Sequence, residues 1–231
     1  MRSMTSSTSS TGATGTTSFE NAKANPHGSR GKRIHATESL IVAALGDSIT
    51  EGSPEYDARR GGDERSQWEY WATLAEPRLS FRNCGVYGER TDEIAARLDE
   101  CARGAEVLVV QGGVNDIAQG RPVTVAAATL HRMVRRGTEL GHRVAVADVL
   151  PWNNGWPRTE PQIRQLNALV AAIAAEEGVP LLAFHDALED PDRRGRMKQE
   201  WTHADGDHPS IAGYRRLGEL AAKTLAPFLS K

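Results

Sequence analysis

Short apolar runs alternate along the chain with longer segments of mixed polarity, beginning at Leu40. The runs are rich in Val, Ile and Leu, which is typical of strands that are buried on both faces. Strands that alternate with helices predict a parallel sheet with right-handed crossovers and helices on both sides. We therefore expect one three-layer α/β/α domain. Its predicted strands are residues 40–45, 79–83, 107–110, 144–150 and 181–184.

The segments between the runs carry helix signals at their ends. Thr91 is the expected N-cap of one helix, because two acidic residues follow it and apolar residues then recur with helical spacing. Thr159 should cap a second helix, and Gly178 should end it. The last helix is expected to span residues 210–224.

The first 38 residues differ in composition from the rest of the chain. Residues 4–18 are mostly Ser, Thr and Gly, which is too polar a composition to fold alone. We expect a disordered tail over residues 1–38 and a folded domain over residues 39–231. The tail lacks the apolar stretch of a secretory signal peptide, so a cytoplasmic location is expected.

Composition and charge narrow the classes of protein. With 231 residues, of which 39% are hydrophobic, the chain can bury a sizeable core. A net charge of −2 gives no electrostatic reason to expect a nucleic-acid partner, and no apolar run is long enough to span a bilayer. The two cysteines, Cys84 and Cys101, lack metal-ligand spacing. We expect two free thiols, with a single bridge between them left open.

Residues suited to chemistry follow the predicted strands at their carboxyl ends, where parallel sheets bind ligands. The first such segment spans residues 44–52, in which Gly46 allows a sharp turn and Ser48 offers a hydroxyl nucleophile. The same residues could form a simple turn in which Asp47 caps a helix. This segment alone does not decide between the two interpretations.

Two further segments could bind an oxyanion. In residues 83–91, Gly85 and Gly88 let the backbone present an N–H without a side chain in the way. At the end of the third strand, the Asn115 amide could donate a hydrogen bond without carrying a charge. Taken singly, both segments are well explained as ordinary loops, with Asp116 capping the next turn.

The fourth segment joins an Asp to a His before the last helix. Asp205 lies three residues before His208, so its carboxylate can hold one ring nitrogen while the other faces a serine. A His also titrates near neutral pH, as a general base must. A solvated surface turn is the plain alternative. A metal site made of His203, Asp205, Asp207 and His208 is less favoured, because no HExxH motif or cysteine pair accompanies it.

All four segments occur together, in the order given above. This set of segments resembles the conserved blocks of the SGNH hydrolases, also called the GDSL esterase/lipase family. The resemblance covers roughly residues 40–228, and it implies a flavodoxin-like five-stranded sheet and no cofactor. The matching blocks are Gly46-Asp47-Ser48-Ile49, residues 83–91, Gly113-Val114-Asn115-Asp116 and Asp205-Gly206-Asp207-His208.

The resemblance also implies a role for particular residues. Ser48 is the implied nucleophile, His208 its general base and Asp205 the acid that orients the histidine. The backbone N–H groups of Ser48 and Gly88, together with the side chain of Asn115, would hold the oxyanion. Hydrolysis would pass through a covalent acyl-enzyme.

Two regions could shape the substrate pocket. Residues 151–157 include Trp152, Asn153 and Trp156, whose indoles and amide suit a sugar or a short acyl group. Tryptophans that only pack the loop are an equal alternative. Neither this segment nor residues 53–66 forms the long apolar lid expected for triglyceride substrates. We expect a serine esterase that acts on small-molecule esters of short acyl groups, with carbohydrate acetates as one example.

Three alternatives stay open at the level of the sequence. A lysophospholipase or thioesterase would use the same catalytic residues, and so would an acyltransferase that passes the acyl group to an alcohol or amine. A non-catalytic flavodoxin-like binding domain would need no triad, and the complete set of blocks argues against it. The sequence predicts no oligomeric state.

Overall fold

The computed structural model describes residues 39–57, 59 and 61–230. The expected disordered tail, residues 1–38, lies outside these described residues.

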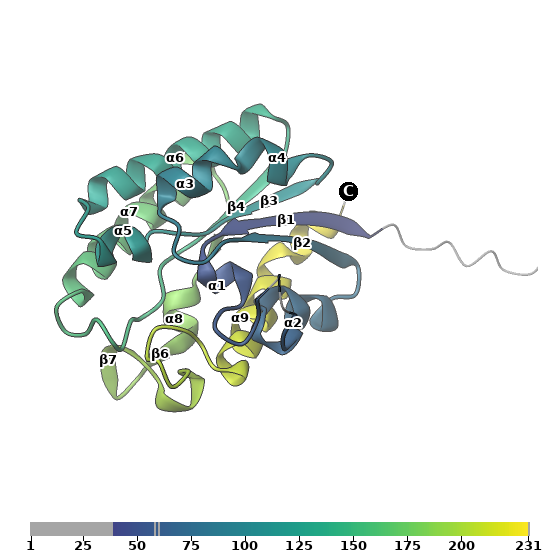
Figure 1. Cartoon of the computed structure of the whole chain (residues 1–231). Coiled ribbons are helices and arrows are strands. Elements are labelled where there is room, and N and C mark those ends of the chain that lie inside the picture. Colours follow the sequence, from purple (N-terminus) through teal and green to yellow (C-terminus); the bar gives the residue numbers. More distant parts are fainter. Residues whose placement is uncertain (1–38, 58, 60, 231) are drawn as a thin grey trace, which may run out of the picture. The chain divides into compact units, whose positions relative to one another are not determined.

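A five-stranded sheet forms the centre of the described domain (Figure 1). Its strands are β1 (Leu40–Gly46), β2 (Leu79–Gly85), β3 (Val107–Val110), β4 (Arg143–Ala147) and β5 (Leu181–Leu182). All neighbours pair in parallel, in the order β2-β1-β3-β4-β5. This order confirms the flavodoxin-like sheet, and it places the switch point, where such sheets bind ligands, between β1 and β3.

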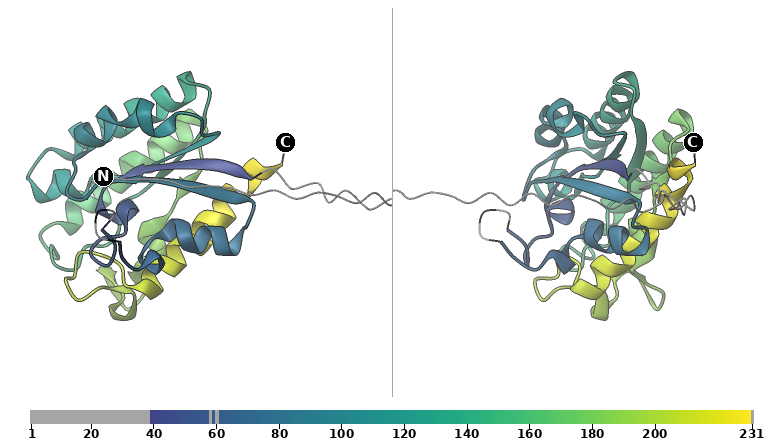
Figure 2. Two further views of the ribbon diagram at one scale, coloured as in Figure 1. Left: turned by 45° about the vertical axis from the view of Figure 1, so that its right-hand side comes forward. Right: turned by 90° about the vertical axis from the view of Figure 1, so that its right-hand side faces the viewer.

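Helices cover both faces of the sheet (Figures 1 and 2). One face carries α3 (Thr91–Ala96), α4 (Leu98–Ala102), α5 (Val114–Ala118), α6 (Val123–Glu139) and α7 (Glu160–Glu177). The other carries α1 (Ser48–Glu51), α2 (Trp68–Ala75), α8 (Phe184–Leu188) and α9 (Ile211–Leu225). In the part of the chain that the structure describes, no helix combines the length and the apolar character needed to cross a membrane.

Smaller elements lie outside the three layers. An antiparallel hairpin, which no sequence pattern predicted, pairs β6 (Glu189–Asp190) with β7 (Arg193–Met197). The 3₁₀ helices are η1 (Glu64–Ser66), η2 (Gln199–Trp201) and η3 (Ala226–Leu229).

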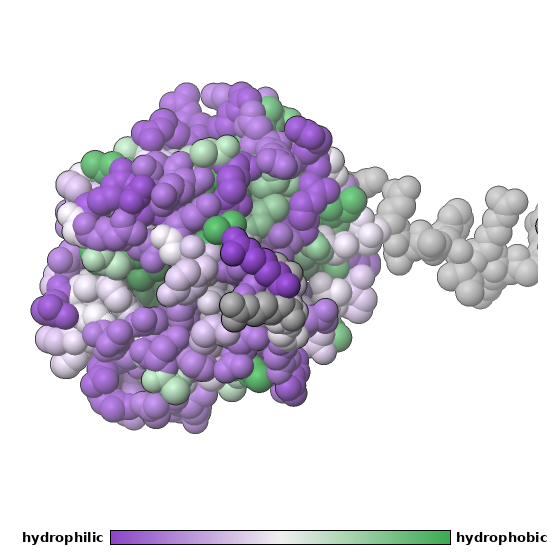
Figure 3. Space-filling model, viewed as in Figure 1, coloured by the Kyte–Doolittle hydropathy of each residue, from purple (hydrophilic) through white to green (hydrophobic). Residues whose placement is uncertain are grey.

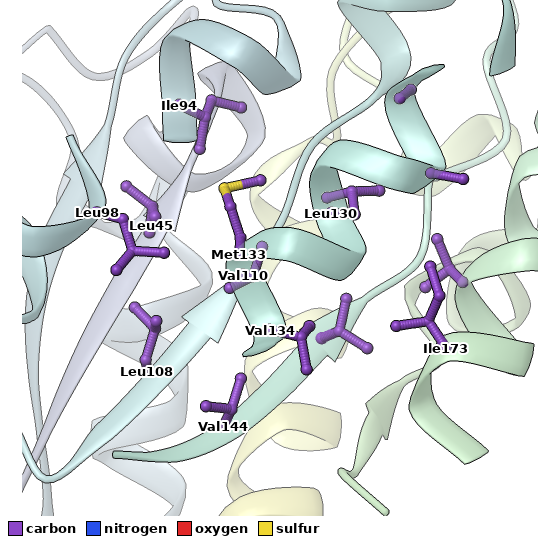
Figure 4. Close-up of a cluster of buried hydrophobic side chains, with 14 of the residues drawn as sticks. Leu45, Ile94, Leu98, Leu108, Val110, Leu130, Met133, Val134, Val144 and Ile173 are labelled. Atoms are coloured by element: carbon purple, nitrogen blue, oxygen red, sulfur yellow. The ribbon is translucent and has the colours of Figure 1, made fainter. Parts of the chain in front are cut away.

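Each face of the sheet buries its own apolar core. On β3, Leu108 and Val110 belong to the core beneath α6, whereas Val107 and Val109 belong to the core on the opposite face. Figure 4 shows the first of these cores, in which Leu130 of α6 packs above the sheet. All four β3 side chains are fully buried, and each contributes about 2 kcal/mol by leaving water. Burial on both faces explains why the strand is apolar at every position.

The helix ends follow the sequence signals in three of four cases. Thr159 occupies the N-cap position of α7, although its side chain makes no capping hydrogen bond. Ser210 caps α9, because its side chain accepts a hydrogen bond from the Gly213 N–H. Gly178 ends α7 in the left-handed conformation, with a φ of 64°. The prediction for Thr91 is wrong: α3 begins at this residue and Arg90 occupies the cap position. The Thr91 side chain bonds to another segment instead.

A disulfide joins Cys84 at the end of β2 to Cys101 on α4, with a distance of 6.1 Å between their Cα atoms. The expectation of two free thiols is therefore wrong. The sequence shows how far apart the cysteines are along the chain, but only the packing of α4 beside β2 brings the thiols together. Disulfides are rare in the cytosol, so this bond weighs against the expected cytoplasmic location.

Candidate active site

Ser48 is the first residue of α1 and follows β1 directly. Asp47 occupies the N-cap position, and its side chain accepts a hydrogen bond from the Ile49 N–H at 3.0 Å. The two interpretations of the sequence therefore fall on one turn, which caps α1 through Asp47 and also carries the buried Ser48. The cap fixes the backbone on both sides of the serine.

The turn between β1 and α1 requires a glycine. A Cβ on Gly46 would lie 2.3 Å from Thr50 Oγ1 and 2.4 Å from Gln111 Oε1. That Gln111 oxygen accepts hydrogen bonds from the Asp47 N–H at 3.1 Å and from the Thr50 hydroxyl at 2.9 Å. Because Gln111 directly follows β3, its side chain ties the ends of two neighbouring strands together beneath Ser48.

Asp47 is a buried carboxyl beside Ser48. Its Oδ2 atom has no hydrogen-bond partner among the described residues. Burial raises the pKa of Asp47 to about 6, against the opposing effect of the Ile49 N–H. This carboxyl therefore titrates in a range in which free aspartates are fully charged.

Ser48, His208 and Asp205 form one chain of contacts. His208 Nε2 lies 3.0 Å from Ser48 Oγ, and His208 Nδ1 lies 2.7 Å from Asp205 Oδ2. Both distances suit hydrogen bonds. The second contact favours a proton on Nδ1, which leaves Nε2 as the acceptor that faces the serine hydroxyl. The geometry is therefore able to remove a proton from Ser48.

The second oxygen of Asp205 is also engaged. Asp205 Oδ1 accepts hydrogen bonds from the N–H groups of Asp207 at 2.9 Å and His208 at 3.1 Å. Partial burial works against the charged form of Asp205, but these hydrogen bonds and the contact with the His208 ring outweigh it and lower its pKa to about 2. The carboxylate is therefore charged at neutral pH.

The candidate oxyanion donors lie across the switch point from His208. Asn115 on α5 donates a hydrogen bond from Nδ2 to the Glu89 carbonyl oxygen at 2.9 Å, which fixes its amide beside Gly88. Gly88 has a φ of 77°, a conformation that favours glycine. A pocket of about 100 Å³ joins these groups to the serine. Its lining consists of Ser48, Ile49, Tyr87, Gly88, Val114, Asn115, Ala118, Trp152, Asp207 and His208.

Gly85 has a packing role that differs from that of Gly88. A Cβ on Gly85 would lie 2.0 Å from the Glu51 backbone nitrogen, so only glycine lets β2 approach α1 this closely. Asn83 reinforces the approach: its Oδ1 accepts from the Gly85 N–H at 2.8 Å, and its Nδ2 donates to the Thr50 carbonyl at 2.6 Å.

Asp116 supports the site from behind and does not cap the next turn, so that expectation is wrong. Its two carboxylate oxygens accept hydrogen bonds from the Thr91 N–H at 2.9 Å and from the Thr91 hydroxyl at 3.0 Å. The start of α3 is thereby tied to α5, which carries Asn115.

Arg97 is a supporting residue that the sequence analysis missed. It lies between α3 and α4 and forms an ion pair with Glu89 at 2.6 Å. Its Nη1 donates to the Cys84 carbonyl oxygen at 2.8 Å, and Nη2, which also makes the ion pair, donates to the Gly46 carbonyl oxygen at 3.1 Å. One side chain thus ties the loop around Gly88 to the ends of β1 and β2. The only sequence signal was an arginine in the middle of a predicted helix.

Of the three predicted substrate contacts, only Trp152 lines the pocket. Its Nε1 donates to Asp207 Oδ1 at 2.6 Å. Asn153 instead binds both backbone groups of Met197 on β7, at 2.7 and 2.8 Å. Trp156 packs against the Arg196 guanidinium, 5.0 Å from the ring centre, and lies outside the pocket lining.

His203 contacts Asp205 but lies outside the pocket lining. Its Nε2 lies 3.0 Å from Glu55 Oε1, and its Nδ1 lies 3.3 Å from Asp205 Oδ2. Of the four residues in the alternative metal site, Asp207 is bound by Trp152 and Asp205 by His208. Among the described residues, the groups with donor atoms close enough to share a metal lie elsewhere and consist of His131, Glu176 and Glu177, and of His185, Asp186 and Glu189.

Comparisons with known proteins identify the family of the chain. The model of the GDSL-like Lipase/Acylhydrolase family matches residues 44–216. A member of the lipolytic protein G-D-S-L family from Veillonella parvula is 22% identical, with a TM-score of 0.69 over 81% of this chain and 99% of its own. The lipase/acylhydrolase from Enterococcus faecalis is 22% identical, with a TM-score of 0.67 over 82% and 96%.

A third similar structure is a catalytic mutant of an acetylxylan esterase from Geobacillus stearothermophilus. It is 19% identical, with a TM-score of 0.65 over 80% of this chain and 94% of its own. No curated protein matches the sequence. The family match covers most of the chain, including all four sequence blocks. The chain therefore belongs to the GDSL-like lipase/acylhydrolase family, the SGNH hydrolases, and is a carboxylic ester hydrolase.

Proposed function

We propose that this protein is a serine esterase that removes short acyl groups through a covalent acyl-enzyme. The observation that carries the proposal is the unbroken chain of contacts from Ser48 through His208 to Asp205, at 3.0 and 2.7 Å, at the wall of a small pocket. A nucleophile, a base within hydrogen-bond reach and a group that orients the base are the parts that acyl transfer needs.

In this proposal Ser48 Oγ attacks the ester carbonyl while His208 Nε2 takes its proton. Asp205 stabilises the imidazolium that forms, because its carboxylate is charged and in contact with Nδ1. His208 then gives the proton to the leaving alcohol. In the second half of the reaction it activates a water molecule, which releases the acid and frees Ser48.

The developing oxyanion would be held by the N–H groups of Ser48 and Gly88 and by the Asn115 side chain. The Nδ2 group of Asn115 carries two hydrogens, and the hydrogen bond to Glu89 uses one. The second Nδ2 hydrogen can therefore be donated to the oxyanion. Loss of one such donor typically costs on the order of a hundredfold in turnover.

The pocket size favours short acyl groups. Its volume of about 100 Å³ is well below the roughly 300–1,000 Å³ of pockets that bind drug-sized ligands. Val114, Ala118 and Trp152 give its lining apolar surface. An acetyl or butyryl group fits such a space, whereas a long acyl chain would have to leave it. The fold likeness to an acetylxylan esterase is consistent with acetate as the acyl group.

An aryl-ester series tests the proposal. We expect the highest kcat/KM at about two to four acyl carbons, because the pocket volume limits longer chains. Ser48→Ala should abolish activity while retaining the melting temperature of the wild type. Ser80→Ala, which alters an exposed serine on β2, is the matched control and should leave activity unchanged. A folded Ser48→Ala protein that hydrolyses the esters as fast as wild type would overturn the proposal.

A further inference from the structure

Tyr87 is the most exposed of the large hydrophobic side chains in the described part of the chain, with 65% of its surface accessible. An isolated exposed apolar side chain needs no explanation. The position of Tyr87 does need an explanation, because this side chain also lines the pocket beside Ser48.

The ring of Tyr87 is stacked on the general base. Its centre lies 6.3 Å from the centre of the His208 ring, and the two planes differ by 26°. The backbone that carries the ring is held to β1, because the Val86 N–H donates to the Gly46 carbonyl at 3.1 Å. Tyr87 therefore presents a flat aromatic surface at a defined place next to the imidazole.

The proposed mechanism fixes which half of the ester meets this surface. The acyl group would lie against Val114, Ala118 and Trp152, which give the pocket apolar surface. The leaving oxygen has to lie within reach of His208 Nε2, which protonates it. Because Tyr87 lies against the His208 ring, the alcohol half of the ester leaves the site past Tyr87.

The pocket that Tyr87 lines holds both apolar and polar groups. Asp207 supplies a carboxylate to its wall, and only one of its oxygens, Oδ1, accepts the hydrogen bond from Trp152 Nε1. The face of the molecule drawn in Figure 3 is mainly hydrophilic. A long aliphatic alcohol would meet the Tyr87 ring in this pocket, but it offers no hydroxyl that could bond to the Asp207 carboxylate.

We propose that Tyr87 is a specificity-determining residue that stacks against a carbohydrate ring on the alcohol side of the ester. The inference rests on the proposed esterase function and names its substrate class. A pyranose offers a face of C–H groups that packs on an aromatic ring, and hydroxyls at its edge that bond to carboxylates. Tyr87 supplies the first of these complements, and the Asp207 carboxylate in the same pocket supplies the second.

The test compares two esters with the same acyl group, a monoacetylated methyl xylopyranoside and ethyl acetate. Tyr87→Ala should raise KM for the sugar acetate about tenfold, the size of a lost aromatic stacking contact, and leave ethyl acetate nearly unaffected. Tyr87→Phe keeps the ring and should behave as wild type. Tyr70→Ala, which removes a tyrosine on α2 outside the pocket, should change neither ester.

Each contrary outcome has a definite meaning. Equal losses on both esters, with a shift in the pH profile of kcat, would show that Tyr87 only positions His208, and would overturn the inference. A larger effect on octyl acetate than on the sugar acetate would replace the carbohydrate with an aliphatic alcohol. Failure of the proposed function would look different, because Ser48→Ala would then still hydrolyse ethyl acetate.

Discussion

Two aspartates flank Ser48 and His208, the proposed catalytic pair, and their surroundings are opposite. Asp47 precedes Ser48 and is fully buried, with one carboxylate oxygen left without a partner among the described residues. Asp205 is partly exposed, and both of its oxygens accept hydrogen bonds. Burial raises the pKa of Asp47 to about 6. The pKa of Asp205 falls to about 2, because its hydrogen bonds outweigh its partial burial.

The difference separates two jobs that one residue type performs within a single site. Asp47 shapes the turn that presents the nucleophile, and contacts from Gln111, far along the chain, hold that turn. Asp205 and His208 lie three residues apart and hold each other within one local turn. The serine side of the site therefore depends on the tertiary fold, whereas the histidine side depends on a short sequence.

The largest effect should come from the histidine side. His208→Ala should lower kcat/KM at least a thousandfold, roughly the contribution of a positioned general base, with little change in melting temperature. His203→Ala is the matched control, since this ring contacts Asp205 but is 26% exposed and lies outside the pocket lining. It should retain most of the activity, and the reverse ranking of the two variants would reassign the base.

The next effect concerns the loop that carries Gly88. The disulfide between Cys84 and Cys101 closes a segment of 17 residues around this loop. Replacing both cysteines by serine should lower the free energy of unfolding by about 3 kcal/mol, mainly because the unfolded chain gains freedom. Urea unfolding and steady-state kinetics on the same samples would measure it. A large fall in kcat without a fall in stability would show that the bond positions the oxyanion donors instead.

The smallest expected effect is a difference between Asp47 and Asp205 in how the free energy of unfolding depends on pH. The folded-state pKa of Asp47 is raised, so the stability it contributes is present below about pH 4 and is lost as the pH rises through about 6. Relative to Asp47→Asn, the wild type should lose about 2 kcal/mol between pH 4 and pH 6. The asparagine can still accept the Ile49 hydrogen bond, so the variant should fold.

Asp205 should show the opposite sign. Its pKa is lowered on folding, so its contribution is present above about pH 4 and is lost as the pH falls towards 2. Unfolding curves of Asp205→Asn and wild type across this range measure the difference. Parallel pH dependences for the two aspartate variants would contradict the division between them.

Much of this arrangement could be read from local sequence. The apolar runs placed the starts of β1, β2, β3 and β5 at their observed residues, because burial on both faces demands apolar side chains in succession. The run at residues 144–150 extended past the end of β4, because the loop after the strand is also buried. Periodicity reports burial and not hydrogen bonding, so it could not find that boundary.

The sequence by itself determined the order of the elements, the edge of the sheet where the chemistry lies, and the local turn that joins Asp205 to His208. Each of these depends on residues close together in the chain. Only the tertiary structure decided that Cys84 meets Cys101, that Arg97 holds the Gly88 loop, that Asn153 binds β7 and that Tyr87 covers His208. These contacts join residues that lie on different elements, and such partners are selected by how the helices pack on the sheet, which no local pattern records.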